Sequence, residues 1–400
     1  MRLRASKAGS ASTVSGLGNP ISDLAQAQPS LDLNFAYNKN LVDSVSGNEL
    51  VTFTRASTAT YVDSDGVIKS KAANTPRFDH DLVTGKSLGL LIEEARTNIV
   101  LKSEKLNDWI VGGGSSVTAN QATAPDGTTT ADRVQHGSGG SSWIRQDVLT
   151  SGKTYTVSVY AKAVNPGTDD QFTFDLGGLS SVFTATNQWQ RFTFTGTASN
   201  AAIYLNNGDD TFATDVYFWG AQVEEASFAS SYIPTDSASV TRAADVAQIT
   251  GTNFTSFYNQ SEGTVFAEAV SYPHPITSKA LVPIAFSDNS YANRITLASS
   301  TATNQFNFDV TTGNSLQRAN VGNFASTGLK VAGAYKSTGS AGSIDGASAV
   351  TSSTPNIAST INRLDIGNAH DSSQFINGHI KQLVYFSTRI PDANLQYITA

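Results

Sequence analysis

Apolar and polar side chains alternate along most of this chain, which is the two-residue period of a strand with one buried face. The alternation is clearest over Thr154–Tyr160, Gly263–Ala269 and Phe306–Val310. Stretches rich in Gly, Asn and Asp separate such segments, and Asp63–Gly66 interrupts one of them in a way typical of a hairpin. Many short strands joined by turns predict an all-β chain built of β-sandwiches.

Two segments depart from this alternation. Leu88–Ile92 is a continuous apolar run, and its short length favours a buried strand over a helix, although periodicity alone does not decide. Near the end of the chain, Asp392 together with Leu395 and Tyr397 predicts a terminal helix of one or two turns.

Changes in residue composition and in the pattern of apolar positions divide the chain into four parts. Residues 1–30 are rich in Ser, Ala and Gly and lack a period, which predicts an extended arm that becomes ordered on docking; a terminus without a role is the alternative. Residues 31–98 read as a small β-rich module, residues 99–237 as a jelly roll and residues 238–400 as a second sandwich. The predicted fold is therefore a small N-terminal β module followed by two β-sandwich domains of the jelly-roll type.

The composition narrows the classes of function. Hydrophobic residues make up 39% of the chain and charged residues 15%, which favours neutral surfaces and strands over exposed helices. A net charge of -7 argues against nucleic-acid binding, which needs a concentrated basic surface. The absence of cysteine excludes disulfides and cysteine-ligated zinc.

Targeting signals are also missing from the sequence. No apolar run of a secretory signal follows the basic residues Arg2, Arg4 and Lys7. No stretch approaches the roughly 20 apolar residues that a membrane-spanning helix needs. We therefore expect a protein made in a cytoplasm, without a secretory route of its own and without membrane insertion.

One part of the chain resembles a known family. Phe53–Val62, with Thr75–Asp79 and Gly89–Asn98, is similar to a module common in phage and prophage structural proteins, including tail-fibre and head-fibre (spike) components. The resemblance implies a protein of the virion surface, assembled in the host cytoplasm and docked on capsid, portal or tail proteins through its N-terminal arm. Arg2, Arg4 and Lys7 are then candidates for the virion anchor, and a homotrimer is expected, as in phage fibres of this kind.

Two further resemblances concern the sandwiches. Trp189–Phe192 and Phe218–Glu224 are similar to carbohydrate-binding-module jelly rolls, and Phe375–Ile380 with Ile390–Leu395 resembles the last strands and helix of concanavalin-A-like (laminin-G-like) sandwiches. Many such jelly rolls hold a structural Ca²⁺ with paired Asp residues near the end of a strand. The corresponding place here reads Phe-Trp-Gly, so the resemblance supplies no ligands for that ion.

The densest group of oxygen ligands lies in another turn. It consists of four side chains: Asn206, Asn207, Asp209 and Asp210. Their spacing is not that of an EF-hand, and a plain turn is the preferred interpretation. We expect no metal site and no cofactor.

Catalytic patterns are also absent from the sequence. A glycosidase needs two carboxylates about 5–9.5 Å apart, whereas neighbours on a strand, such as Glu93/Glu94 and Glu224/Glu225, point to opposite faces. The pairs Asp169/Asp170 and Asp209/Asp210 lie in turn-like loops. There is no Gly-x-Ser-x-Gly elbow, no metal-ligand spacing of His and no coil repeat of the parallel β-helix that depolymerases usually have. The prediction is a protein that is not an enzyme.

Sugar binding fits the residue types better. Sugars stack their apolar faces on aromatic rings, and amide and carboxylate groups bind their hydroxyls. The candidates for carbohydrate binding are Trp109, Trp143, Tyr155 and Trp189 in the jelly roll, and Tyr291, Asn293, His370 and Asp371 in loops of the C-terminal sandwich. For the four jelly-roll aromatics, the alternative is a place in the sandwich core.

Three functions follow from these observations. The first is a virion fibre or spike that binds host cell-surface glycans through several copies at once, so that weak single contacts add up. The second is a purely structural head-decoration or tail-scaffold protein that binds no sugar. The third, and the least supported, is a polysaccharide depolymerase.

Overall fold

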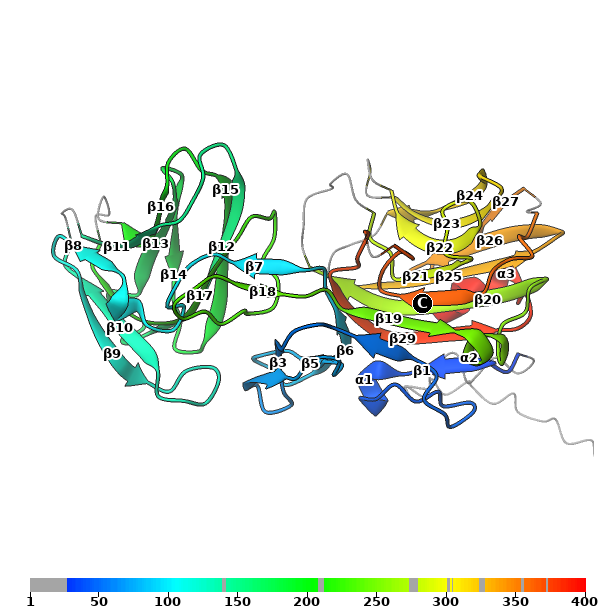
Figure 1. Cartoon of the computed structure of the whole chain (residues 1–400), viewed down its shortest axis with the longest axis horizontal. Helices are drawn as coiled ribbons and strands as arrows, with labels where there is room; N and C mark the ends of the chain where they lie inside the picture. The colour runs from blue at the N-terminus through cyan, green and yellow to red at the C-terminus, as the bar shows by residue number, and fades with distance from the viewer. Residues whose placement is uncertain are drawn as a thin grey trace, which may run out of the picture.

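The computed structural model describes residues 27–138, 142–207, 212–272, 280–300, 303, 305–323, 328–353, 356–371 and 373–400. Two β-sandwich lobes lie side by side and are joined by the paired strands β7 (Arg96–Asn98) and β18 (Val240–Arg242) (Figure 1). The sheets of both lobes are antiparallel throughout the described strands. The predicted all-β, multi-sandwich fold is confirmed.

The larger lobe contains the C-terminal residues and has two sheets. The eight-stranded sheet has the order β27-β26-β25-β20-β29-β6-β5, and β1 pairs with β29 as well. Its strands are β1 (Leu31–Leu33), β5 (Phe78–His80), β6 (Ser87–Ile92), β20 (Glu262–Ser271), β25 (Leu329–Lys336), β26 (Gly339–Ile344), β27 (Val350–Ser352) and β29 (Gly378–Phe386). The apolar run of residues 88–92 is therefore a buried strand, as its length predicts.

The seven-stranded sheet of this lobe has the order β2-β19-β28-β21-β22-β23-β24. Its strands are β2 (Thr52–Thr54), β19 (Val246–Thr250), β21 (Ile284–Ser287), β22 (Arg294–Ser299), β23 (Gln305–Thr312), β24 (Ser315–Asn323) and β28 (Arg363–Ile366). Alternate side chains from both sheets fill the core between them, among them Leu90, Phe308 and Leu383. At Gly333 on β25 the sheets approach so closely that an added Cβ would overlap the Phe308 ring.

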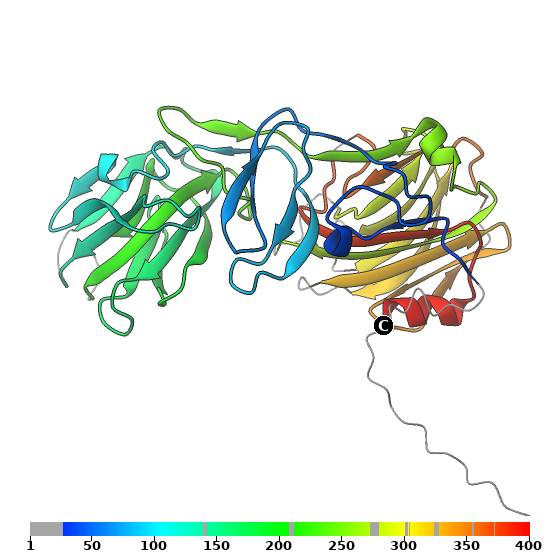
Figure 2. The same cartoon turned by 90° about the horizontal axis from the view of Figure 1, so that it is seen from below.

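In the described segments, three short helices accompany these sheets: α1 (Phe35–Asn38), α2 (Gly251–Thr255) and α3 (Asp392–Thr399). Leu395 and Ile398 of α3 pack on Phe266 and Val384, which point outward from the eight-stranded sheet, so the helix covers part of that face (Figure 2). The predicted terminal helix is confirmed. No helix in the described part of the chain combines the length and apolar character needed to cross a membrane.

The smaller lobe is the predicted jelly roll, with sheets in the orders β15-β12-β17-β10-β9 and β14-β13-β16-β11-β8. A cluster of phenylalanines that includes Phe172, Phe174 and Phe218 fills its core. The single-turn helix η1 (Leu106–Asp108) precedes the first strand. The strands are β8 (Ile110–Gly112), β9 (Ser116–Ala122), β10 (Ala131–His136), β11 (Trp143–Asp147), β12 (Thr154–Ala163), β13 (Gln171–Leu176), β14 (Ser180–Thr184), β15 (Gln190–Thr197), β16 (Ala202–Asn207) and β17 (Thr214–Glu224).

Residues 31–98, predicted as a separate module, are shared between the two lobes. Strands β1, β5 and β6 belong to the eight-stranded sheet and β2 to the seven-stranded sheet. The hairpin β3 (Ala59–Val62)–β4 (Ile68–Lys71) instead places Ile68 in a cluster with Tyr160 and Trp219 of the jelly roll. Strands of three to six residues bury too little surface for a core of their own, so they pair with larger sheets. The jelly roll is therefore an insertion within the sequence of the larger sandwich.

Little of the predicted N-terminal arm lies within the described residues. Residues 1–26, with the proposed anchor residues Arg2, Arg4 and Lys7, lie outside them. Ala27 packs against the cluster around α3, and the backbone N–H of Ser30 donates to the Tyr385 carbonyl at 2.8 Å. The last residues of the predicted arm thus run along the eight-stranded sheet.

Candidate functional site

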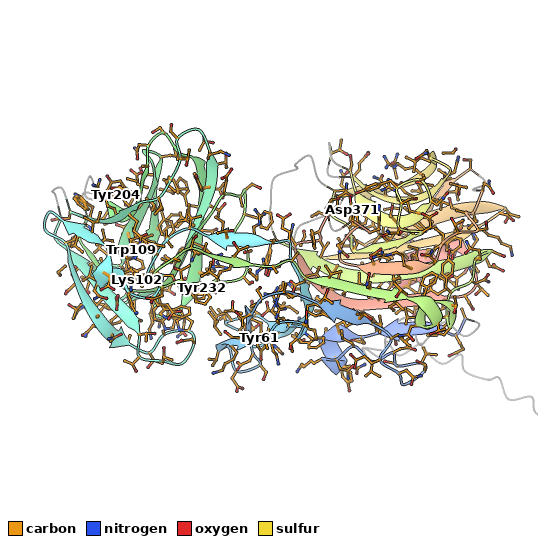
Figure 3. The ribbon with its side chains drawn as sticks, viewed as in Figure 1. Tyr61, Lys102, Trp109, Tyr204, Tyr232 and Asp371 are labelled. Carbon is orange, nitrogen blue, oxygen red and sulfur yellow. The ribbon has the colours of Figure 1, made fainter. Side chains whose placement is uncertain are left out.

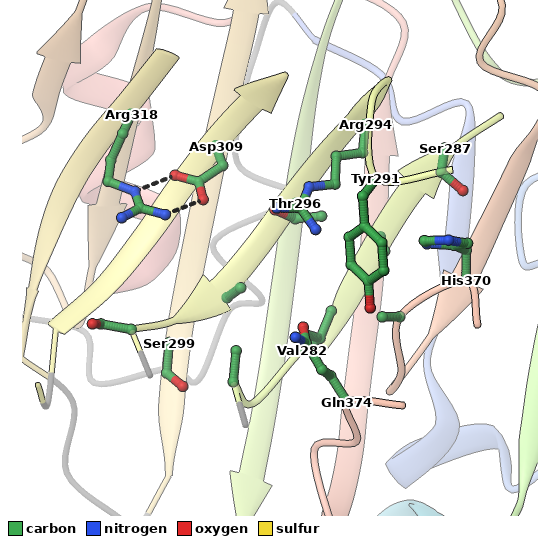
Figure 4. A pocket seen from close by; sticks show the side chains of 15 residues that line it. Val282, Ser287, Tyr291, Arg294, Thr296, Ser299, Asp309, Arg318, His370 and Gln374 are labelled. Atoms are coloured by element: carbon green, nitrogen blue, oxygen red, sulfur yellow. Dashed lines mark hydrogen bonds and ion pairs between the residues drawn. The ribbon is translucent and has the colours of Figure 1, made fainter. Parts of the chain in front are cut away.

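A groove of about 450 Å³ lies on the outer face of the seven-stranded sheet, across β21 to β24 (Figure 4). The strand register explains which side chains reach it. Ile295 on β22 and Phe308 on β23 point into the core, so the residues that alternate with them along these two strands point outward. One row of outward residues crosses four strands in register: Ala285, Thr296, Asp309 and Arg318. This position on a rigid sheet holds the groove in a fixed shape.

Small apolar side chains form part of the groove wall. Ala280, Val282 and Ala285 are buried together, with Ala298 packed against them. Because these side chains are short, they leave the space that longer residues would fill. The groove thus combines an apolar surface with the polar groups of the neighbouring strands.

Tyr291 forms one corner of the groove. Its side chain is 39% exposed, and the ring meets His370 edge-on with centroids 4.5 Å apart. Its hydroxyl lies 2.9 Å from Asp371 Oδ2 and 2.8 Å from Ser373 Oγ. Burial opposes ionisation of Asp371, but hydrogen bonds from Ser373 and Tyr291 outweigh it and lower the pKa of this carboxyl. Tyr291 therefore presents a fixed, partly exposed aromatic ring.

Two guanidinium groups face the groove. Arg318 donates from Nε and Nη2 to the two oxygens of Asp309, each at 2.7 Å, so this pair is a two-point salt bridge. Arg294 lies with its guanidinium carbon 4.8 Å from the centre of the Tyr291 ring. Burial lowers the pKa of Arg294, and Asp309 only partly offsets this. Figure 4 shows Arg294 beside Tyr291 and apart from the Arg318–Asp309 pair.

Two of the four loop candidates in this lobe line the groove. Tyr291 and His370 do so, while Asp371 contacts the Tyr291 hydroxyl at the edge of the groove. The Asn293 amide instead donates to Asp288 Oδ2 at 2.7 Å, and its oxygen accepts from the Gly313 N–H at 2.9 Å. Asn293 therefore braces its own loop rather than the groove.

Two of the jelly-roll candidates are core residues. Trp109 and Tyr155 are 5% and 3% exposed. The Trp109 indole donates to the Lys102 carbonyl at 3.2 Å, and the Tyr155 hydroxyl accepts from the Thr150 N–H at 3.0 Å. Figure 3 shows Trp109 within the lobe. Because both rings are enclosed, they do not offer a face to a sugar, and the core alternative holds for them.

Trp143 and Trp189 are half-buried but lie on different parts of the jelly roll. Trp143 points outward from β11 and meets Tyr204 edge-on at 6.2 Å, with the Arg145 guanidinium 4.9 Å from its ring. Trp189 packs against the cluster that includes Tyr160, and its indole donates to the Thr123 carbonyl at 2.9 Å. The aromatic candidates therefore do not form one platform. Trp143 and Tyr204 form a small aromatic surface on the jelly roll, and Figure 3 shows Tyr204 on a different lobe from Asp371 at the edge of the groove.

Glu93 belongs to a buried network of charged residues at the junction of the lobes. Arg77 donates to Glu93 at 2.8 Å and to Asp245 at 2.5 Å, and all three side chains are almost fully enclosed. The backbone N–H and hydroxyl of Ser231 also donate to Glu93, each at 2.7 Å. Burial opposes ionisation of Glu93, but Arg242, Arg77 and Ser231 together lower its pKa. This carboxylate therefore holds the lobes together.

No cluster of His, Asp and Glu suited to a metal occurs among the residues that the structure describes. The four residues considered as Ca²⁺ ligands are not covered: Asp209 and Asp210 lie outside the described residues, as do the side chains of Asn206 and Asn207. The turn interpretation of this group stays a prediction.

The sequence reasoning missed Arg294, Asp309 and Arg318. Their signal was present, because each alternates with core residues such as Ile295 and Phe308. Alternation places them on an outer face, but only the pairing of β22, β23 and β24 brings them into one groove.

No family model and no curated protein sequence matches this chain. Solved structures with distant similarity include a CBM40 domain of the Ruminococcus gnavus IT-sialidase bound to α2,3-sialyllactose, with 9% identity and a TM-score of 0.30, covering 36% of this chain and 84% of that one. The tandem CBM22 domains of Paenibacillus barcinonensis Xyn10C share 12% identity, with a TM-score of 0.25, over 74% of this chain and 99% of that one. Domains LG4-5 of the mouse laminin α1 chain share 10% identity, with a TM-score of 0.21, over 70% and 83%. Similarities this distant do not say what this chain binds.

Proposed function

We propose that this protein binds glycans without cleaving them and that the binding site is the groove on the seven-stranded sheet. The observation that supports this most is the combination of a partly exposed Tyr291 ring, a small apolar wall and polar side chains around one groove of about 450 Å³. Binding sites for small ligands usually fall between about 300 and 1,000 Å³ and combine an apolar lining with a few fixed polar groups. A sugar ring has one apolar face and a rim of hydroxyls, which suits this lining.

The Asp371 carboxylate at the edge of the groove supports binding over hydrolysis. A glycosidase needs one carboxylic acid that stays protonated to donate to the leaving oxygen. The pKa of Asp371 is lowered, and both oxygens of Asp309 accept from Arg318. The environment of Asp371 therefore disfavours a protonated acid. This agrees with the proposal that the protein is not an enzyme.

A glycan array followed by calorimetry on the best hit tests this proposal. Replacing Tyr291 with Ala removes the exposed ring, and we expect affinity to fall about 5- to 150-fold, the effect of losing a stacked aromatic contact worth roughly 1–3 kcal/mol. Tyr37→Ala is the matched control, because Tyr37 is 83% exposed on α1 in another part of the lobe. Equal loss in both variants, or no loss in Tyr291→Ala, contradicts the assignment of the site.

The aromatic surface around Trp143 is a second candidate for sugar contact. Gly112 lies under the Trp143 ring, where an added Cβ would overlap it, and Arg145 bonds the Tyr204 hydroxyl at 3.2 Å. The ring is thus held on an open sheet face. Binding that is lost in Trp143→Ala and kept in Tyr291→Ala would place the sugar on the jelly roll.

We also propose the wider setting that the resemblance of residues 53–98 implies: a homotrimeric fibre or spike on a phage particle, with host cell-surface glycans as ligands. Deletion of residues 1–26 tests the anchor, since Ala27 and Ser30 stay with the folded lobe. Particles that lack the shortened protein would support an anchoring arm, and normal incorporation would remove it. A folded protein that binds no glycan but still decorates particles would favour the purely structural alternative.

A further inference from the structure

The arginines of the described chain differ in whether they have partners. Eleven of them lie in described segments, and all but one make a salt bridge or a hydrogen bond with another described residue. The exception within these segments is Arg294. No hydrogen bond or ion pair joins its guanidinium to the described residues, and its Nε is enclosed without a hydrogen-bond partner.

This lack of a partner is costly for a group in such a position. Arg294 is half-buried, and burial lowers its pKa, which means that the fold disfavours its charged form. The Tyr291 ring, 4.8 Å below the guanidinium carbon, supplies a weak attraction in place of an anion. A partly desolvated guanidinium that faces a groove favours an anionic ligand, because the anion supplies the salt bridge that the guanidinium lacks.

The nearby carboxylates do not serve as that partner. Asp309 is two residues along β23 from Thr311, which lies opposite Arg294, and both of its oxygens accept from Arg318. Asp371 lies beyond salt-bridge distance of Arg294 and is oriented by Ser373 and Tyr291. The Arg318–Asp309 pair is neutral overall, whereas Arg294 faces the groove without a salt bridge to any described residue.

The neighbouring strand has further unused polar atoms on the same sheet face. Asn307 Oδ1 and Thr311 Oγ1 are enclosed without hydrogen-bond partners among the described residues. Their strand positions are opposite Ala298 and Arg294, both of which line the groove. A ligand with both hydroxyls and an acid group would supply partners to such a face.

We infer that the groove binds a glycan that carries carboxylates and that Arg294 pairs with one carboxylate of an acidic sugar. This inference rests on the proposed function and specifies its ligand class. Arg294 sets the preference for acidic over neutral sugars, while Tyr291 supplies the stacking surface that any sugar uses.

The test uses the full chain and pairs of oligosaccharides that differ only in charge. Oligogalacturonate, hyaluronan and oligosialic acid are each compared with the product of chemical reduction of their carboxyl groups. We expect at least one acidic member to bind, and its reduced counterpart to bind at least about tenfold more weakly, which is the lower end of what a charged hydrogen bond contributes. A sulfated dextran distinguishes carboxylate recognition from general attraction to anions, and equal binding of that polymer contradicts the inference.

Two substitutions locate the effect. Arg294→Met should remove the preference for the acidic member, and Arg294→Lys should keep only part of it, because Lys retains the charge but not the planar pair of donors. Lys105→Met is the matched control for net charge, since Lys105 is exposed on the other lobe. The melting temperature of Arg294→Met should stay level or rise, because no described residue forms a salt bridge with this charge; a clear fall would indicate a structural role and overturn the inference.

The remaining outcomes separate the two proposals. Binding of neutral glycans that depends on Tyr291 but not on Arg294 would keep the proposed function and overturn this inference. Absence of binding to every acidic and neutral glycan tested would contradict both.

Discussion

At the scale of single residues, the partner of each arginine indicates its role. Arg77 lies between Glu93 and Asp245 and is fully enclosed, and Arg55 reaches Asp245 at 3.1 Å. These groups join residues far apart in the sequence, and Ser231 ties the jelly-roll end to the same network. Arg294, on the strand β22, makes no salt bridge with any residue that the structure describes. Arg55 and Arg77 therefore stabilise the junction, whereas Arg294 is available to bind a ligand.

The junction network gives a prediction for stability and its dependence on pH. Glu93→Gln leaves Arg77 and Arg242 with less negative charge in an enclosed site, so we expect the free energy of unfolding to fall by about 3–5 kcal/mol. Glu225→Gln is the matched control, because Glu225 is exposed beside Lys153 and should change stability by less than about 0.5 kcal/mol. Urea unfolding at neutral pH measures both.

The sign of the pH effect follows from the lowered pKa of Glu93. The folded state holds this carboxyl ionised, so its contribution is complete above the unfolded pKa of about 4.3 and is lost as the pH falls from there toward the folded value. The wild type should therefore lose stability below about pH 4 more steeply than Glu93→Gln. Parallel curves for the two proteins would show that this carboxylate does not hold the junction.

At the scale of elements, local alternation predicted the strands well and their partners poorly. The segments around β12, β20 and β23 alternate clearly, and the structure has strands there. In contrast, β1 pairs with β29, so that Leu33 lies opposite Leu383, and nothing local specifies a partner so distant. Directly after β1, the Asn34 side chain accepts from the Tyr37 N–H and caps the short helix α1.

The same limit explains how much of the candidate site the sequence revealed. Tyr291 and His370 were found because they are aromatic or titratable residues in polar loops. Arg294 and Asp309 were missed, since their meeting depends on the register of β22 and β23. Trp109 and Tyr155 were named as candidates because residue type alone does not separate a core aromatic ring from an exposed one.

The packing between the two large sheets can be tested at one position. Gly333→Ala would place a methyl group against the Phe308 ring, and we expect a loss of about 1–3 kcal/mol in the free energy of unfolding. The smaller side chain of Phe308→Leu makes room for the methyl group. Adding Gly333→Ala to Phe308→Leu should therefore reduce the free energy of unfolding by less than Gly333→Ala does in the wild type. Additive losses in the two changes would mean that these residues do not oppose each other between the sheets.

At the scale of the whole molecule, the jelly roll is an insertion, and the larger sandwich is assembled from both sides of it. Strands β1, β2 and β6 precede the jelly roll in sequence and pair with strands that follow it, and β5 pairs with β6 at the edge of the sheet. Strands β7 and β18 lie side by side at the two ends of the insertion. The larger lobe therefore needs residues from before and after the jelly roll.

This arrangement predicts which shortened chains will fold. Residues 238–400 alone lack four strands of the two sheets, so this chain should be insoluble or lack a cooperative unfolding transition. A chain in which a short flexible turn joins Asn98 to Val240 keeps these strands and should unfold cooperatively, with a lower melting temperature because the hairpin β3–β4 loses its jelly-roll contacts. A stable, cooperatively folded chain of residues 238–400 would contradict the assignment of the early strands.

A crystal structure of the full chain with a bound oligosaccharide would show whether the groove over β21 to β24 is the glycan site. We expect electron density for a sugar ring against Tyr291, with an acid group within hydrogen-bond distance of the Arg294 guanidinium. A sugar bound on the jelly roll, with this groove unchanged and unoccupied at saturating ligand, would contradict this assignment.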